Sequence, residues 1–393
     1  MTLFIALIIA PLALLNCCFA VEVLFGLRPL RPSVRSITTS RRAVIVVPAH
    51  DEEAVLAASL SKLKDAASGR AEILLVADNC ADSTADIARR LGVEVIERAD
   101  AVRKGKGFAL DFARSKLRLD PPEVVVVIDA DCFVEPESIE RLVAECAATA
   151  LPCQAIYLQT PVRDGPPPLQ LSTFAFFVRN AVRQRGLERL GRGTHLVGTG
   201  MAFPWALFDR AALATDNIVE DLALGLEFID AGYPPLLVDD AVVWSHPAAQ
   251  HSTLDQRRRW EGGYLATAFR WAPWMIASSL RRGDPRGLWS GASLLIPPFA
   301  LLLLMDVGAL CLAILMAWQI GAGQWPAAIL GGSIAGTGIA LVLAWFAGGS
   351  RFVSLRGLAR APLYLIWKLP LYLGLVRRGA PKEWVRTHRG ESS

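Results

Sequence analysis

The chain has 393 residues, of which 53% are hydrophobic and 20% charged, and its formal net charge is +4. These values exclude an ordinary soluble enzyme, which is less apolar, and a bundle made only of membrane helices, which carries fewer charges, so we expect a soluble domain joined to membrane helices. The weak net charge, with arginines beside apolar stretches, argues against nucleic acid as a partner.

The first predicted element is an apolar run over residues 3–27, which is long enough to cross a bilayer. Positive residues follow this run and none precedes it, which predicts that the N-terminus lies outside and the next domain in the cytosol. A cleaved signal peptide would carry its positive charge before the apolar run. We therefore expect residues 1–27 to be a permanent transmembrane anchor.

A soluble domain is predicted over residues 43–262. Short apolar runs at 43–48, 73–77, 93–97 and 124–129 alternate with helical stretches such as 52–67 and 83–91. Continuous apolar strands between helices indicate an α/β fold with a mainly parallel sheet covered on both faces. The seven cysteines are scattered without Cys-x-x-Cys spacing, as is typical of a reducing, cytosolic setting.

The remaining chain is predicted to associate with the membrane. Trp271 and Trp274 around Arg270 favour an interfacial segment over residues 263–287, and transmembrane helices are expected at 288–320 and 326–349, the first with a kink at its two prolines. Residues 361–376 are short, contain Lys368, and have positive residues on both sides, which favours an in-plane or re-entrant helix. We therefore expect a protein that crosses a cell membrane several times, namely a bacterial inner membrane, with its soluble domain in the cytosol.

Acidic residues follow three of the predicted strands, at the edge where open α/β sheets place their ligands. For the first two strand ends, capping of the next helix is an equally good interpretation. The third reads Asp129-Ala130-Asp131 directly after a buried strand. Two carboxylates there repel each other and lose water, and a divalent cation bridging them to a diphosphate would compensate.

These blocks, in this order, resemble the membrane-bound family 2 glycosyltransferases, the group of cellulose, hyaluronan and chitin-oligosaccharide synthases and ceramide glucosyltransferases. The resemblance covers about residues 43–262. It implies a GT-A fold, an inverting mechanism and a UDP-sugar donor bound with magnesium or manganese. By position it assigns Asp131 to the metal, Asp129 beside it to donor or metal, and the remaining donor contacts to Ala49, Glu52, Asp78, Lys106, Gln256, Arg259 and Trp260.

On the acceptor side, the resemblance implies that Asp221 is the general base. The loop Gly198-Thr199-Gly200-Met201 and Glu220 would face the acceptor. Inverting transfer needs a carboxylate to take the acceptor's proton and positive charge to hold the departing diphosphate. Alternatively, the Glu220-Asp221 pair is a helix N-terminal charge pair, and the basic strip 257–259 contacts lipid phosphates.

Two departures from the family pattern affect the expected reaction. The block before the base reads Ile218-Val219-Glu220-Asp221, without the threonine of the polymerising members, and membrane helices are fewer than in the large synthases. We therefore expect transfer of one sugar to a lipid, lipid-linked or saccharide acceptor, with processive polysaccharide synthesis as the alternative.

A catalytically silent nucleotide-sugar-binding scaffold is the alternative of another class. A dehydrogenase is disfavoured because Gly105-Lys106-Gly107 lacks the third glycine of the dinucleotide motif.

Overall fold

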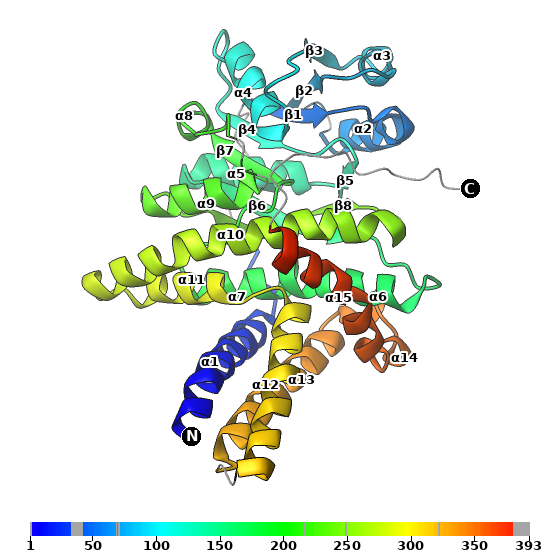
Figure 1. Cartoon of the computed structure of the whole chain (residues 1–393). Coiled ribbons are helices and arrows are strands. Elements are labelled where there is room, and N and C mark those ends of the chain that lie inside the picture. Colours follow the sequence, from blue (N-terminus) through cyan, green and yellow to red (C-terminus); the bar gives the residue numbers. More distant parts are fainter. Residues whose placement is uncertain are drawn as a thin grey trace. The chain divides into compact units, whose positions relative to one another are not determined.

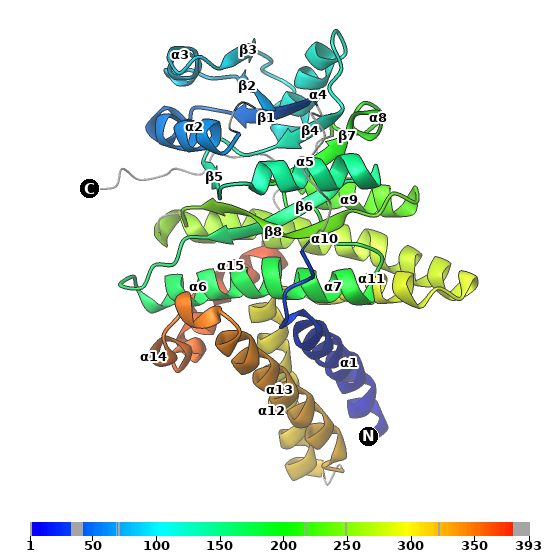
Figure 2. The same ribbon diagram turned by 180° about the vertical axis from the view of Figure 1, so that it is seen from behind.

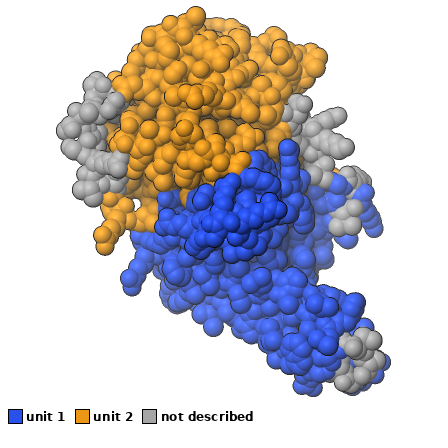
Figure 3. All heavy atoms as spheres, turned by 90° about the vertical axis from the view of Figure 1, so that its left-hand side faces the viewer, with its two compact units in different colours: residues 1–29, 161–192, 264–380 blue, residues 30–160, 193–263, 381–393 orange. Residues whose placement is uncertain are grey.

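The protein is described by a computed structural model over residues 2–32, 42–67, 69, 71–215, 217, 219–247, 250–320 and 323–379, and the side chains at 250–256 lie outside this description. The chain forms two compact units, drawn in blue and orange in Figure 3. Unit 1 comprises Met1–Pro29, Pro161–Arg192 and Tyr264–Ala380, and unit 2 comprises Leu30–Thr160 and Gly193–Gly263. Residues 161–192 lie within the predicted 43–262 region but belong to unit 1.

Unit 2 is built on one mixed sheet (Figure 1). Its strands, in chain order, are β1 (Ala43–Ala49), β2 (Ala71–Asp78), β3 (Glu94–Arg98), β4 (Val124–Val127), β5 (Cys132–Val134), β6 (Cys153–Gln159), β7 (Met201–Pro204) and β8 (Leu236–Ser245). In space the order is β3-β2-β1-β4-β7-β6-β8-β5. The four predicted strands are confirmed as the parallel half β3-β2-β1-β4.

The other half of the sheet is mixed. Strand β7 runs antiparallel to both β4 and β6, β5 runs antiparallel to β8, and β6 and β8 are parallel. The antiparallel β7 begins immediately after the Gly198-Thr199-Gly200 loop and pairs Met201 with Val127. This pairing brings the loop to the end of β4, where the Asp129-Ala130-Asp131 motif follows.

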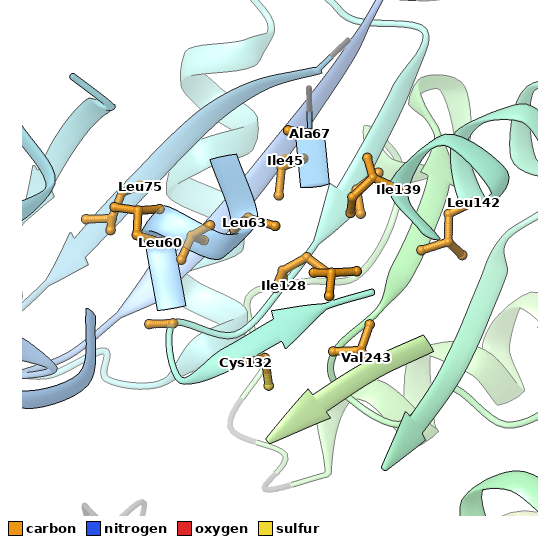
Figure 4. Close-up of a cluster of buried hydrophobic side chains, with 14 of the residues drawn as sticks. Ile45, Leu60, Leu63, Ala67, Leu75, Ile128, Cys132, Ile139, Leu142 and Val243 are labelled. Carbon is orange, nitrogen blue, oxygen red and sulfur yellow. The ribbon is translucent and has the colours of Figure 1, made fainter. Parts of the chain in front are cut away.

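Helices cover both faces of the sheet, as predicted from the continuous apolar strands. These helices are α2 (Glu53–Ala67), α3 (Thr84–Arg90), α4 (Lys106–Leu117), α5 (Ser138–Thr149), α8 (Trp205–Phe208) and α9 (Glu220–Asp230). On one face Ile45 of β1, Leu60 and Leu63 of α2, and Leu142 of α5 belong to one buried apolar cluster (Figure 4). The opposite core joins β1, β4 and β7 to α4 and α9, and Figures 1 and 2 show α9 and α5 on opposite sides. Each fully buried Leu or Ile contributes roughly 1.5–3 kcal/mol.

Unit 1 is helical. It contains α1 (Thr2–Gly26), α6 (Pro167–Phe177), a π-helical turn (Val178–Arg183), α7 (Gln184–Leu190), the part of α10 (Gln250–Arg282) from Tyr264 onward, α11 (Pro285–Leu295), α12 (Phe299–Ile320), α13 (Trp325–Phe346), α14 (Leu355–Leu358) and α15 (Ala361–Arg378). Three described segments are long and apolar enough to cross a membrane, Thr2–Gly26, Phe299–Gln319 and Trp325–Phe346. The predicted run 288–320 is split, because α11 ends before Pro297 and Pro298 and α12 begins after them.

Two buried polar clusters join the helices of unit 1. The Asn16 amide donates to both carboxylate oxygens of Asp306, at 2.9 and 3.0 Å, and the Thr337 hydroxyl donates to the Asn16 side-chain oxygen at 3.0 Å. Nearer the end of α1, Glu22 forms an ion pair with Arg183 at 2.5 Å and accepts a hydrogen bond from Ser293 at 2.6 Å. Polar groups inside a helix bundle are stable only when they are paired in this way.

Candidate active site

The turns after β1 and β2 are bound to each other through their acidic residues. The Asp51 carboxylate accepts from the backbone N–H of Ala81 at 2.7 Å, and Glu53 accepts from that of Ser83 at 3.0 Å. In return, the backbone N–H of Glu52 donates to the Thr84 hydroxyl at 2.8 Å. The capping interpretation is thus correct in part, since the Glu52 carbonyl accepts from the first turn of α2 and the acidic side chains join the starts of α2 and α3.

Asp78, the last residue of β2, lies in a buried ion pair. Its Oδ1 accepts from the Arg98 guanidinium at 2.6 Å, and both side chains are less than a tenth exposed. Arg98 also contacts Asp100 at 3.2 Å and the Arg103 carbonyl at 2.7 Å. This contact fixes the orientation of the Asp78 carboxylate at the strand end. Ala49 ends β1 with its side chain in the core, so only its backbone can contact a ligand.

Lys106 is the first residue of α4, and its ammonium joins two other parts of the site. It donates to the Asp129 carboxylate and, at 2.5 Å, to the Gly198 carbonyl. The flanking glycines are required by the backbone, because Gly105 has φ +123° and a Cβ on Gly107 would collide with the Leu213 carbonyl. Burial alone would lower the pKa of Lys106, but the charges of Asp129, Glu220 and Asp221 raise it above its ordinary value.

The Asp-x-Asp motif can provide two oxygen ligands to a metal ion. Ligand atoms of Asp129, Asp131 and Cys132 lie within 4.8 Å of one another. Cys132 is buried in the core, and this burial raises its pKa well above the ordinary range, so the thiol stays protonated. The two carboxylates therefore form an all-oxygen donor set, which suits magnesium or manganese better than zinc.

The loop before β7 lies against this cluster. Its Thr199 hydroxyl accepts from the backbone N–H of Asp129 at 3.1 Å. Gly198 and Gly200 have φ values of +93° and +67°, a region that side chains disfavour. A Cβ on Gly198 would lie 3.2 Å from Asp221 Oδ2 and 3.7 Å from Lys106 Nζ. Lys106 and Asp221 therefore both lie beside Gly198.

Glu220 and Asp221 are the first two residues of α9, so they also form the N-terminal charge pair considered from the sequence. Burial and the neighbouring Asp221 carboxylate raise the pKa of Glu220 to about 8, and Lys106 opposes the rise. The two carboxyl groups titrate as a pair, and burial disfavours a negative charge on both at once. The pair can therefore hold one proton and still offer one carboxylate as a base.

The predicted donor contacts Gln256, Arg259 and Trp260 lie on α10, whose first residues, to Gly263, belong to unit 2. Arg259 and Trp260 are half-buried, whereas the side chain of Gln256 is outside the description. A Cβ on Gly263 would lie 2.9 Å from Val219 Cγ1, directly before Glu220. The absence of a side chain at Gly263 lets α10 pack closely on the turn that begins α9.

Sequence reasoning missed Arg98 and Gln154. Arg98 directly follows the third predicted strand and ends β3, and a charged residue at a strand end was an available signal. Gln154 is 1% exposed within an otherwise apolar stretch of β6, so a buried amide with partners elsewhere could have been suspected.

A mixed sheet with acidic residues at the carboxyl ends of β1, β2 and β4, covered by helices on both faces, defines a GT-A domain. Residues 44–211 match the family described as Glycosyl transferase family 2. This match agrees with the predicted resemblance of the soluble domain to family 2 glycosyltransferases.

Among solved structures, the chain is similar to the mannosyltransferase PcManGT from Pyrobaculum calidifontis in complex with GDP-Man and Mn²⁺, with 18% identity and a TM-score of 0.56 over 96% of this chain and 99% of that one. It is also similar to glucosyl-3-phosphoglycerate synthase from Mycobacterium tuberculosis, with 20% identity and a TM-score of 0.40 over 61% of this chain and 84% of that one. The TM-score of 0.56 to the mannosyltransferase shows a shared fold. No protein with a curated description matches the sequence.

Proposed function

We propose that unit 2 transfers a sugar from a nucleotide-sugar, most simply a UDP-sugar, to an acceptor hydroxyl with inversion at the anomeric carbon. The observation that supports this most strongly is the convergence of Lys106, Asp129, the Gly198 carbonyl and Asp221 within a family 2 domain. In such a cluster a carboxylate can serve as the base, and the lysine can bind the diphosphate that leaves.

The donor would bind at the carboxyl ends of the parallel strands. The Ala49 backbone, Glu52 and Asp78 would contact the nucleoside, with Asp78 oriented by Arg98. Lys106 would contact the diphosphate. Asp131, with Asp129 beside it, would hold a magnesium or manganese ion, which supplies positive charge to the leaving diphosphate when bound.

Asp221 would accept the proton of the acceptor hydroxyl as its oxygen bonds to the anomeric carbon and the nucleoside diphosphate leaves. Its position beside Gly198 and Lys106 supports this role, because base and donor then meet at one place. Glu220, protonated at neutral pH, would donate a hydrogen bond on the acceptor side. Gln256, Arg259 and Trp260 on α10 would complete the donor side, and the close packing of Gly263 on Val219 holds this helix beside the base.

The acceptor would be a lipid, a lipid-linked sugar or a saccharide at the cytosolic membrane face. Three candidate spanning helices in the same chain support a membrane location. The arginines after the first of them support a cytosolic catalytic domain and an N-terminus outside, as in a bacterial inner-membrane protein. Transfer of a single sugar is the simpler reaction, and processive synthesis is the alternative.

A panel of UDP- and GDP-sugars tests the proposal. Purified full-length protein with manganese should release one nucleoside diphosphate when membrane lipid extract is added as acceptor, and the Asp221→Asn variant should not. UDP release would support the proposed donor, whereas GDP release would support the proposed reaction with a guanine nucleotide as the donor. GDP-sugars belong in the panel because the mannosyltransferase of the same fold was solved with GDP-Man. No release from any donor, in protein that also binds none of them, would contradict the proposal.

A further inference from the structure

Gln154 on β6 is a buried amide that holds the loop before β7. Its Nε2 donates to the carbonyls of Ala155 and Thr199, each at 2.8 Å, with the Gly200 carbonyl further away at 3.4 Å. Its Oε1 accepts from the backbone N–H of Val197 at 3.0 Å. The side chain therefore binds the backbone on both sides of Gly198.

The loop that Gln154 holds makes two of the contacts that organise the candidate site. The Gly198 carbonyl accepts from the Lys106 ammonium at 2.5 Å, and the Thr199 hydroxyl accepts from the backbone N–H of Asp129 at 3.1 Å. The direction of both groups depends on the backbone at Gly198, which has positive φ and no side chain of its own to anchor it. The Gly200 backbone is bonded to Val127 and Ala155, and Gln154 holds Val197 and Thr199, the residues on either side of Gly198.

An apolar side chain of the same size would fill this position and would need no hydrogen-bond partners. An amide at 1% exposure is tolerated only because its hydrogen bonds are made, and a satisfied buried network fixes one backbone arrangement. This favours a role in specifying the loop over a role in packing.

We propose that Gln154 is a positioning residue for sugar transfer, which acts by fixing the Gly198 carbonyl and the Thr199 hydroxyl and thereby the placement of Lys106 and Asp129. This inference rests on the proposed function. Gln154 would contact neither donor nor acceptor. Its loss should therefore lower kcat more than the affinity for the nucleotide, because the nucleoside contact Asp78 is held by Arg98 and Asp131 stays in place, whereas transfer needs Lys106 and Asp129 in register with Asp221.

The test is the Gln154→Met variant in full-length protein, which keeps the volume and removes the hydrogen bonds. We expect kcat to fall roughly 10- to 100-fold, as for a small misplacement of catalytic groups, with the nucleotide dissociation constant within about threefold. Gln170→Met is the matched control. Gln170 is also a buried amide whose Nε2 holds two backbone carbonyls, those of Arg163 and Gly165, but it lies in unit 1. Its kcat per folded molecule should stay at the wild-type value.

Thr199→Val removes the hydrogen bond between the loop and the Asp129 backbone without changing β6. It therefore tests the proposal even if the Gln154→Met protein does not fold. It should lower kcat roughly 3- to 10-fold. In the double variant the loss of kcat should be smaller than the product of the two single losses, since both residues act through one loop. Unchanged kcat in Thr199→Val, or equal kcat per folded molecule in Gln154→Met and Gln170→Met, would overturn the inference. A wild-type protein that transfers no sugar would instead contradict the proposed function.

Discussion

Two clusters of buried charge, one in each unit, differ in their balance. In unit 2 one cation, Lys106, faces the three carboxyl groups of Asp129, Glu220 and Asp221. In unit 1 one carboxylate, Glu22, faces one guanidinium, Arg183, and also receives the Ser293 hydroxyl. An excess of like charge opposes folding, whereas a matched pair with its hydrogen bonds complete holds helices together. The unbalanced cluster is therefore the one expected to serve a reaction.

The largest expected effect comes from the acidic motif of unit 2. Asp131→Ala should lower manganese-dependent nucleotide affinity by roughly two orders of magnitude and abolish transfer, because the diphosphate would then face Asp129 with much of the compensating charge lost. Calorimetry with and without manganese measures this. The same manganese dependence in the variant and in wild type would show that Asp131 is not a ligand.

Gly198→Ala should lower kcat by roughly 10- to 100-fold, since the new methyl group would lie 3.2 Å from Asp221 Oδ2. The matched control is Gly232→Ala, which has a similar φ of +85° but open space around the added Cβ. Both variants should lose about 1–2 kcal/mol of stability from backbone strain. A control as inactive as Gly198→Ala would show that strain alone explains the loss.

In unit 1 the matched pair should affect stability. Arg183→Met should cost about 3 kcal/mol, because it leaves the buried Glu22 carboxylate without its cation. The double variant Glu22→Gln, Arg183→Met should recover much of this. Thermal unfolding in detergent or lipid nanodiscs measures both, and an Arg183→Met protein as stable as wild type would contradict the distinction between the two units.

The last prediction concerns the dependence of stability on pH. The pKa of Glu220 is raised from 4.5 to about 8, so the folded state holds a proton that the unfolded chain has lost. Its contribution to stability is complete below pH 4.5 and is lost as the pH rises towards 8. Asp221, Lys106 and Asp129 face this group and share in the titration. Glu220→Gln should flatten the dependence of the unfolding midpoint on pH in this range, and an unchanged slope would show that another group causes it.

The parallel half of the sheet was predictable because buried parallel strands appear as continuous apolar runs, and the acidic residues at their ends mark the ligand edge. Strands β5 and β7 span only Cys132–Val134 and Met201–Pro204, too short for a pattern of their own. The apolar helix α6 has no compositional feature that separates it from the soluble domain, although it belongs to unit 1.

The contacts inside the site were less predictable than its residues. Lys106, Asp129 and Asp221 were each found from motifs, but their convergence depends on β7 pairing with β4. Gln154 bonds to residues 43 to 46 positions away along the chain, and no local pattern encodes such a partner.

The central claim is that unit 2 separates donor binding from proton transfer, and Asp221→Asn tests it most directly. The change is nearly isosteric and leaves Asp129 and Asp131 in place. Nucleotide binding by calorimetry with manganese should stay within about threefold of wild type, while sugar transfer falls by roughly two to four orders of magnitude, as when a general base is removed. Near-normal transfer, or loss of donor binding as complete as in Asp131→Ala, would contradict the account.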